Sequence, residues 1–336
     1  MRERRGRRSV LLLLAHGRTA FATAALLFVT ILPPANADET YPARPIRLLV
    51  GFGAGGPTDI PARFVADKLG SALGRPVVVE NKPASGGIVA TRDLIAQPAD
   101  GYTLLLCTHF DAINSAVYRD PGFKLGELAP VALIEKYYYG LALSNAVPAN
   151  DFRSFIAYAK AHRGEVTYAT VGTGSAQEVI ARQLEKITGV TMNRIPFRGG
   201  IQVVQELIAG RIGFYVSPTL AIYPQYQAKQ LKILAITSPE RVAGLPEVPA
   251  LKEFGISFDR FGWLGICAAA GTPAAIINTL HDRIAPVVAS AEYHQLIDNA
   301  GTVAMSSTPQ ELGTIMNETF DEASASVKEF GLQQDQ

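Results

Sequence analysis

The amino-acid sequence predicts an α/β fold of two lobes, each a mainly parallel β-sheet flanked by helices. The first observation is that apolar, strand-like segments alternate with amphipathic helical segments from Tyr41 onward. This alternation indicates largely parallel sheets covered on both faces by helices. The second observation is length, because the roughly 300 residues that follow the N-terminal segment exceed what one hydrophobic core usually fills.

The first series of elements lies between residues 46 and 107. Short apolar runs predict its strands, and apolar residues at helical spacing, such as Phe64 and Leu69, predict its helices. In chain order these are strand Ile46–Gly51, helix Ile60–Leu73, strand Val77–Glu80, helix Gly86–Ala96 and strand Tyr102–Cys107.

The same rhythm returns after residue 150. The predicted elements are helix Phe152–His162, strand Val166–Thr170, helix Gln177–Thr188, strand Met192–Pro196, helix Gln202–Ala209, strand Arg211–Val216 and strand Leu231–Thr237. Near the C-terminus the predicted helices are Pro273–Ser290, Ala291–Asn299 and Pro309–Lys328. The last begins at Thr308-Pro309, a helix-start signal because proline suits the first helical position.

Two strand-like segments divide the chain into lobes. Tyr139–Ser144 ends the first series and Phe261–Ala268 follows the second. We interpret both as crossings between the lobes, which places lobe I at residues 38–142 plus 262–336 and lobe II at residues 143–261. Such an arrangement predicts a hinge with a cleft between the lobes.

The first 37 residues have the layout of a secretory signal peptide. A cationic start, MRERRGRR, precedes an apolar run at Ala20–Leu32 and the small residues Ala35-Asn36-Ala37. The apolar run is shorter than the roughly 20 residues that a membrane-spanning helix needs. We therefore predict export with cleavage after Ala37. An uncleaved anchor and twin-arginine export, which Arg7-Arg8 loosely resembles, remain the alternatives.

Charge and cysteine content narrow the function further. Cleavage removes six of the 31 Lys and Arg residues and one of the 30 Asp and Glu residues, so the mature chain has 25 against 29, a net charge of −4. This balance does not favour nucleic-acid binding. Cys107 and Cys267 lie in apolar runs, where buried free thiols are commoner, although export permits a disulfide. No histidine has metal-site spacing, so no metal is expected.

A glycine-rich turn follows the first strand. Gly51–Gly56 reads G-x-G-x-x-G and opens a helix, and Glu80 ends the next strand, as in a dinucleotide site. An exported oxidoreductase that binds NAD or FAD is therefore the alternative function. Against it, Asp59 would face the pyrophosphate, and no hydride-transfer signature is present. Glycines and helix-start N–H groups suit a carboxylate equally well, while Asp59 could simply cap the helix.

A second such turn lies in the other predicted lobe. Thr170–Ser175 joins a strand to a helix, with Ser175 in position to be its N-cap. One glycine-rich turn in each lobe suggests a pincer whose hydrogen-bond donors come mostly from the backbone. No triad order, nucleophile elbow or carboxylate pair stands out, so we predict a binding protein without a cofactor rather than an enzyme.

The segment YPARPIRLLVGFGAGGPTDIPARFVADKLGSALGRPVVVENKPASGG, with ADGYTLLL after it, resembles the substrate-binding proteins of tripartite tricarboxylate transporters, the Bug-type family. The resemblance continues through Tyr168–Ser175, Ile195–Gly200, Leu234–Pro249 and Trp263–Pro273. It implies a two-lobed, type II-like periplasmic binding protein fold. It also implies capture of a small organic or aromatic carboxylate in the periplasm, for delivery to membrane permease subunits or a sensor kinase. We expect a monomer.

The resemblance also implies a set of ligand-binding residues by matching position. They are Phe52, Gly53, Ala54, Gly55, Gly56, Thr58, Asp59, Thr108, His109, Thr170, Gly172, Gly174, Ser175, Phe197, Arg198 and Ser217. Two departures matter: Ala54 stands where the family usually has proline, and Ser217 where it usually has an acidic residue. Because serine cannot balance a buried ammonium, we expect carboxylates rather than amino acids. The side chains of Tyr137–Tyr139 are expected mainly to pack on the lobe surface rather than to contact the ligand.

Overall fold

The structure is a computed structural model that describes residues 41–172, 174–197, 199–257, 260–298 and 301–335. The predicted signal peptide lies outside the described residues. Tyr41–Gln336 forms one compact unit. In the part of the chain that the structure describes, no helix is both long enough and apolar enough to span a membrane.

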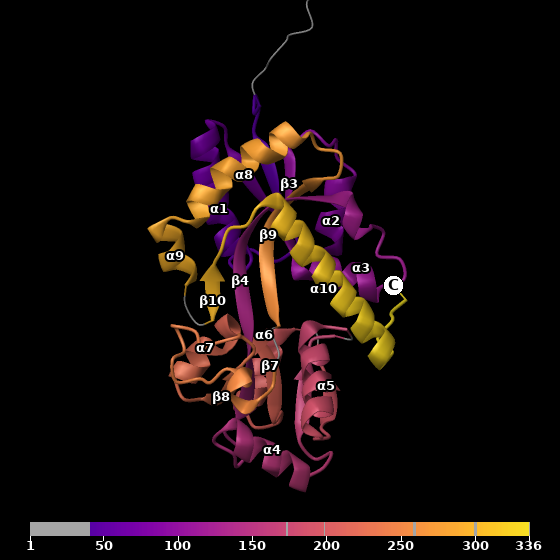
Figure 1. Cartoon of the computed structure of the whole chain (residues 1–336), viewed down its shortest axis with the longest axis vertical. Coiled ribbons are helices and arrows are strands. Elements are labelled where there is room, and N and C mark those ends of the chain that lie inside the picture. Colours follow the sequence, from indigo (N-terminus) through magenta and orange to yellow (C-terminus); the bar gives the residue numbers. More distant parts are fainter. Residues whose placement is uncertain (1–40, 173, 198, 258–259, 299–300, 336) are drawn as a thin grey trace, which may run out of the picture. The chain divides into compact units, whose positions relative to one another are not determined.

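The described strands form one continuous sheet in the order β2-β1-β3-β9-β4-β7-β5-β6, and β8 and β10 also pair with β4. Figure 1 shows β4 and β9 side by side in the middle of the molecule. Their bounds are β1 Ile46–Val50, β2 Val77–Asn81, β3 Thr103–Thr108, β4 Leu128–Ser144, β5 Thr167–Thr170, β6 Asn193–Pro196, β7 Phe214–Pro218, β8 Leu231–Ile236, β9 Phe261–Ala269 and β10 Thr302–Ala304. The outer strands pair in parallel, as predicted. Strands β4 and β9 pair antiparallel with their neighbours, so the sheet is mixed.

Strand β4 joins two sections of this sheet. It pairs with β9 from Leu128 to Tyr138 and with β7 from Tyr139 to Leu143. The first section therefore contains β1, β2, β3, β9, β10 and the start of β4, and the second contains β5 to β8 and the end of β4. The 17 residues of β4 extend well beyond the predicted strand Tyr139–Ser144.

Helices cover both faces of each section. The α-helices are α1 Asp59–Leu73, α2 Ile88–Ile95, α3 His109–Val117, α4 Phe152–Ala161, α5 Ala176–Thr188, α6 Gly200–Ile208, α7 Thr219–Gln227, α8 Ala274–Val288, α9 Ala291–Ile297 and α10 Pro309–Phe330, and the 3₁₀ turns are Ser85–Gly87, Leu125–Glu127 and Leu251–Phe254. In the first section, α1, α8 and α9 pack on the face of Leu48 and Val50, while α2, α3 and α10 pack on the face of Leu49. The period-2 alternation of a strand explains this division.

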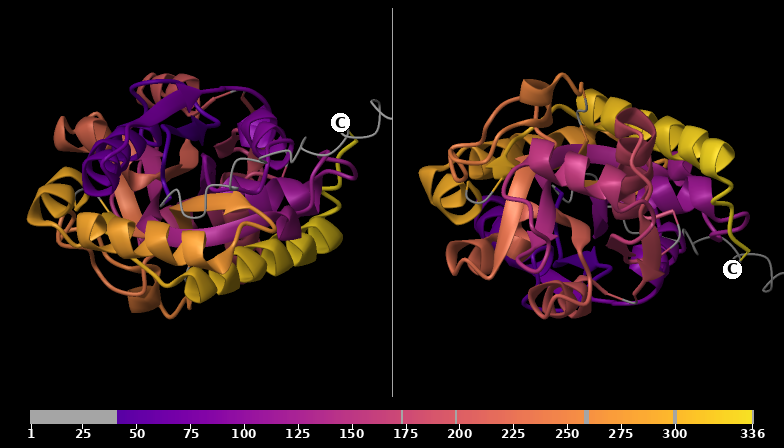
Figure 2. Two further views of the ribbon diagram at one scale, coloured as in Figure 1. Left: turned by 90° about the horizontal axis from the view of Figure 1, so that it is seen from above. Right: turned by 90° about the horizontal axis from the view of Figure 1, so that it is seen from below.

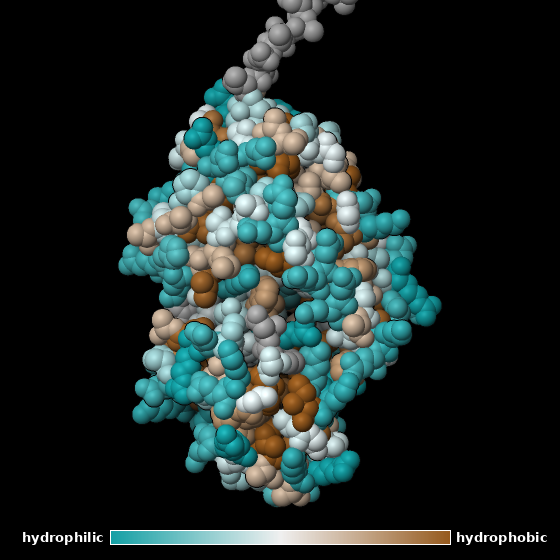
Figure 3. All heavy atoms as spheres, viewed as in Figure 1, coloured by the Kyte–Doolittle hydropathy of each residue, from teal (hydrophilic) through white to brown (hydrophobic). Residues whose placement is uncertain are grey.

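The second section repeats the arrangement. Helices α4 and α5 pack on one face, with Tyr168 and Phe214, and α6 and α7 pack on the other, with Ala169 and Tyr215. In both views of Figure 2, α10 lies on the outside of the strands. On the face shown in Figure 3, apolar side chains occur in small groups among polar ones.

Two helices and one strand were not predicted from the sequence. In α3 the buried face includes His109, Asp111 and Asn114, so no apolar stripe marks it. Helix α7 contains Pro224, which breaks a helical pattern. Strand β10 has only three residues.

The expectation of free buried thiols was wrong. Cys107 of β3 and Cys267 of β9 form a disulfide whose Cα atoms are 5.7 Å apart. The antiparallel register places Cys107 opposite Gly265 and Cys267 opposite Leu105, so the two cysteines lie diagonally on neighbouring strands. Both are fully buried, as their apolar surroundings predicted. Only the pairing of the strands, which local sequence does not reveal, brings the two sulfur atoms together.

Candidate functional site

The first glycine turn, between β1 and α1, is stabilised by Asp59. The Asp59 carboxylate accepts hydrogen bonds from the Gly55 N–H at 2.8 Å, from Asn81 Nδ2 at 2.7 Å and from Arg63 Nε at 2.8 Å. Burial tends to raise the pKa of Asp59, but these bonds outweigh it and hold the pKa below its usual range. Thr58, not Asp59, occupies the N-cap position. Asp59 is 1% exposed, so it supports the turn from within.

The second glycine turn has the same construction. The Gly174 N–H donates to Glu178 Oε2 at 3.1 Å, and Glu178 is fully buried. Arg182 Nε donates to Glu178 Oε1 at 2.9 Å. Ser175 is the N-cap of α5, as predicted, and its hydroxyl accepts from the Glu178 N–H.

Both turns therefore share one spacing of glycine, acid and arginine. Gly55, Asp59 and Arg63 in the first turn match Gly174, Glu178 and Arg182 in the second, each four residues apart. Both glycines have positive φ, 75° and 77°, which glycine adopts without strain. The carboxylates at these turns are structural partners of the backbone and are not available to a ligand.

The first glycine turn forms one wall of a pocket of about 400 Å³, here called the first-turn pocket. Its lining residues come from the turn, from α3, β4, β9 and β10, and from the β7–α7 junction, and they are Phe52, Gly53, Ala54, Gly56, Pro57, Thr58, Phe110, Glu135, Tyr137, Pro218, Leu220, Leu264 and Thr302. Both sheet sections contribute, and the walls are mostly apolar. No described lining residue is Lys, Arg or His.

The second glycine turn lines a different pocket, here called the second-turn pocket. Gly172, Gly174 and Ser175 face it, together with Asn114 of α3. Phe110 lines both pockets and therefore lies between them. The two turns thus flank α3 but do not share one pocket in this structure.

Several residues expected to bind the ligand are buried in the protein. Thr170 and Ser217 are fully buried, and Thr108 is 2% exposed and serves as the N-cap of α3. The half-buried Phe197 packs against the core of the second section. Arg198 lies outside the described residues. The predicted residues that line the first-turn pocket are Phe52, Gly53, Ala54, Gly56 and Thr58.

His109, one of the residues expected to bind the ligand, begins α3 and is 2% exposed. Its Nδ1 lies 3.1 Å from the Tyr137 hydroxyl, and its Nε2 lies 3.3 Å from the Tyr139 hydroxyl. Burial lowers the pKa of His109 to about 3, against an opposing hydrogen bond with the Trp263 backbone. The imidazole is therefore neutral near pH 7 and joins α3 to β4.

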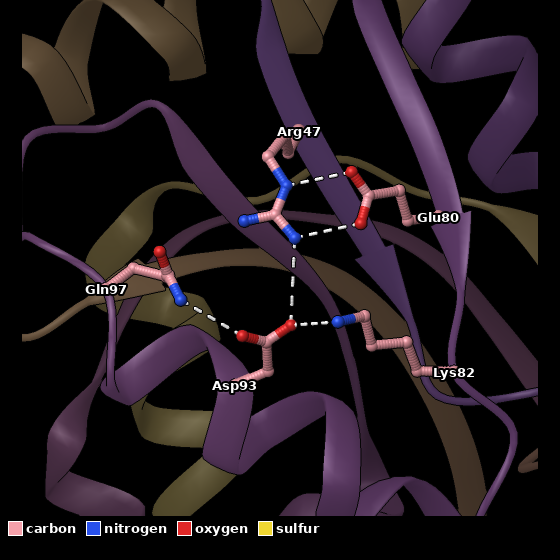
Figure 4. Close-up of polar contacts among 5 residues, drawn as sticks. All are labelled: Arg47, Glu80, Lys82, Asp93 and Gln97. Atoms are coloured by element: carbon pink, nitrogen blue, oxygen red, sulfur yellow. Dashed lines mark hydrogen bonds and ion pairs between the residues drawn. The ribbon is translucent and has the colours of Figure 1, made fainter.

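The dinucleotide alternative required a free acid at Glu80. Instead, Arg47 Nε and Nη2 each donate to the Glu80 carboxylate at 2.8 Å (Figure 4). The bond from Arg47 lowers the pKa of Glu80. Asp93 completes this cluster, since it contacts Arg47 and Lys82 and accepts from Gln97. Glu80 is committed to this network, so a dinucleotide site at the turn is not supported.

The polar residues at the base of the first-turn pocket were not predicted from the sequence. Glu135 and Thr302 line it and are 3% and 4% exposed. Phe110 and Tyr137, which also line it, come from a helix and a strand segment that were not predicted. The signal available was the acidic residue Glu135 within the apolar run of β4. Among the described residues, no group of His, Cys, Asp and Glu could hold a metal ion.

The mixed sheet, the helices on both faces and a pocket lined by both sheet sections define a periplasmic-type solute-binding protein. The chain belongs to the tripartite tricarboxylate transporter family receptors, whose sequence model matches residues 61–332. Members of this family bind a solute and carry out no reaction on it, so the protein is a receptor and not an enzyme.

Individual relatives agree with this assignment. A UPF0065 protein in the gbd 5′ region of Cupriavidus necator is 31% identical over 325 residues, 95% of this chain and 97% of the relative. The solved periplasmic binding protein BugD is 26% identical with a TM-score of 0.75, covering 88% of this chain and all of that one. Rpa4515 of R. palustris, solved with adipate, is 25% identical with a TM-score of 0.78, at the same coverage.

Proposed function

We propose that this protein is exported, cleaved after Ala37, and captures a small carboxylate in the first-turn pocket for a membrane permease or sensor. The observation that carries the proposal is the exposed turn at the pocket wall. Gly53 and Ala54 are exposed and line the pocket, and their N–H groups donate to no other described residue. Backbone N–H groups of a glycine turn suit an anion, and a relative was solved with adipate.

We further propose that binding closes two lobes close to the expected ranges, residues 38–142 plus 262–336 and residues 143–261, with the boundary on β4 four residues earlier than expected. Support comes from β4, whose pairing changes from β9 to β7 between Tyr138 and Tyr139. The other connection is the start of β9 at Phe261, next to the bond from the Thr237 hydroxyl to the Arg260 carbonyl. A movement at these two places would let Pro218 and Leu220 approach the first glycine turn, as in hinge closure around a ligand.

Gly53 is the position at which to test this proposal. A Cβ at Gly53 would meet no described atom within 4 Å, and its φ is not in the left-handed region. We expect Gly53→Glu to reduce carboxylate affinity at least tenfold, because like charges repel strongly in a pocket of low dielectric constant. Gly53→Gln, which adds the same bulk without charge, is the matched control. Gly174 is unsuitable, because a Cβ there would lie 2.9 Å from Val117.

The measurement is isothermal calorimetry of the mature chain, residues 38–336, with adipate, succinate and benzoate. Ligand at about 100 times its Kd should also stabilise the fold by roughly 2.7 kcal/mol. If wild type binds none of these acids, or if Gly53→Glu binds them as well as Gly53→Gln does, the proposed site is wrong.

A further inference from the structure

The floor of the first-turn pocket holds two polar groups without partners. Glu135 Oε2 and Thr302 Oγ1 are inaccessible to solvent and have no hydrogen-bond partner among the described residues. Both residues line the pocket, and both are more than nine-tenths buried. Buried polar atoms are nearly always hydrogen-bonded, so two such atoms at one pocket require an explanation.

Strand pairing brings these groups to the same place. In the antiparallel register of β4 and β10, Thr302 lies opposite Tyr137, and Ala304 lies opposite Glu135. Side chains two residues apart on a strand share a face, so Glu135, Tyr137 and Thr302 project from the same side of the sheet. Tyr137 is already engaged with His109, which leaves Glu135 and Thr302 as the pocket's unpartnered pair.

The residues around Glu135 and Thr302 determine which ligand group can form hydrogen bonds with them. The nearby lining residues Leu264, Leu220 and Phe110 are apolar, and no described lining residue carries a positive charge. A second ionised carboxylate on the ligand would be buried here without a cation to balance it, which is costly. A hydroxyl or an amine would instead donate to the Glu135 carboxyl, and either group could also pair with the Thr302 hydroxyl. Burial raises the pKa of Glu135 to about 8, so the group can also meet a neutral hydroxyl without carrying a charge.

We propose that Glu135 and Thr302 form a polar subsite that binds a hydrogen-bond donor, a hydroxyl or amine, at the end of the ligand opposite its carboxylate. This inference rests on the proposed function, since it takes the first glycine turn as the carboxylate end. The ligand is then a monocarboxylate with an apolar body and a distal donor. Ser217 is buried and does not line this pocket, so the serine at that position does not disfavour an amine here.

Matched ligands test the subsite by calorimetry on the mature chain. One series is benzoate, 4-hydroxybenzoate, 4-aminobenzoate and terephthalate, and a shorter series is butanoate, 4-hydroxybutanoate, 4-aminobutanoate and succinate. In at least one series we expect wild type to bind the hydroxyl or amine compound about tenfold or more tightly than the parent acid and the diacid. This is the size of one hydrogen bond to an ionisable buried group.

Two substitutions connect this preference to the subsite. Glu135→Leu replaces the carboxyl by an apolar side chain of similar size, and Thr302→Val removes the hydroxyl at constant shape. Each should reduce the preference severalfold or more, while affinity for the parent acid stays within about threefold, as expected when a polar partner is replaced by an apolar one of the same shape. Thr302→Ser, which keeps a hydroxyl, should retain the preference. Thermal unfolding of each variant checks the fold, and Thr302→Val decides the matter if Glu135→Leu is unstable.

The outcomes separate the subsite from the proposed function. If wild type binds the parent acids equally well or binds the diacids tightest, the carboxylate pocket stands and the donor subsite is overturned. The subsite is also overturned if both variants keep the preference. If no acid of either series binds, the proposed function fails and the subsite fails with it.

Discussion

Glu135 should make the stability of the protein fall as pH rises, and Glu135→Gln should remove this effect. Burial raises the pKa of Glu135 from 4.5 to about 8. A carboxyl whose pKa is raised on folding keeps its proton in the folded state after the unfolded chain has lost it. Its contribution is therefore fully present below about pH 4.5 and is lost as pH rises through about 8. The shift corresponds to about 5 kcal/mol in total and about 3 kcal/mol by pH 7.

The buried phenols beside Glu135 do not complicate this result. Burial raises the pKa of both Tyr137 and Tyr293, so both stay neutral across the window. The assay is urea unfolding of wild type and Glu135→Gln at several values between pH 4.5 and 8.5. We expect similar stabilities at pH 4.5, and a variant more stable than wild type by several kcal/mol at pH 8.5. The exposed Glu165 supplies the control Glu165→Gln. A difference between wild type and Glu135→Gln that does not change with pH would refute the reasoning.

Two further predictions concern what holds the fold. The Cys107–Cys267 disulfide closes a loop of 160 residues, so replacing both cysteines by alanine should destabilise the folded state by up to about 5 kcal/mol in urea unfolding. Each single replacement already breaks the disulfide and should cost nearly as much, whereas single losses that add up to the loss of the double variant would indicate packing alone. Asp59→Ala should cost about 1–3 kcal/mol, because the Gly55 N–H and Asn81 lose a buried acceptor. Arg63→Ala should cost less than about 1 kcal/mol, because Arg63 is half exposed, and a larger loss from Arg63 than from Asp59 would contradict this assignment of roles.

Local sequence was sufficient for the class of fold and for most of its elements. The alternation of apolar strands with amphipathic helices predicted β1 to β3, β5 to β9 and the described helices except α3 and α7, because each pattern is set by neighbours in the chain. Turn and cap signals were equally local. Ser175 and the Thr308-Pro309 pair begin α5 and α10 where the sequence predicted.

The tertiary structure decided which buried polar side chains have hydrogen-bond partners within the protein and which do not. Asp59 looks like a site residue in sequence, yet it is buried beneath its own turn with an arginine partner, and Glu178 is buried in the same way beneath the second turn. Glu80 likewise belongs to Arg47, across a pair of parallel strands. The sequence does not show whether an acidic residue pairs with another part of the protein or with a ligand. Only the fold distinguishes these two roles.

The pocket floor and the disulfide have the same origin. Glu135 and Thr302 meet because β10 pairs with β4, although about 170 residues separate them in the chain, and Cys107 meets Cys267 because β3 pairs with β9. Pairing of distant strands depends on the packing of the whole sheet rather than on the residues next to each position. The sequence alone therefore determined the family, the elements and the glycine turns, whereas long-range packing decided the partners of the buried charges and the chemistry of the pocket.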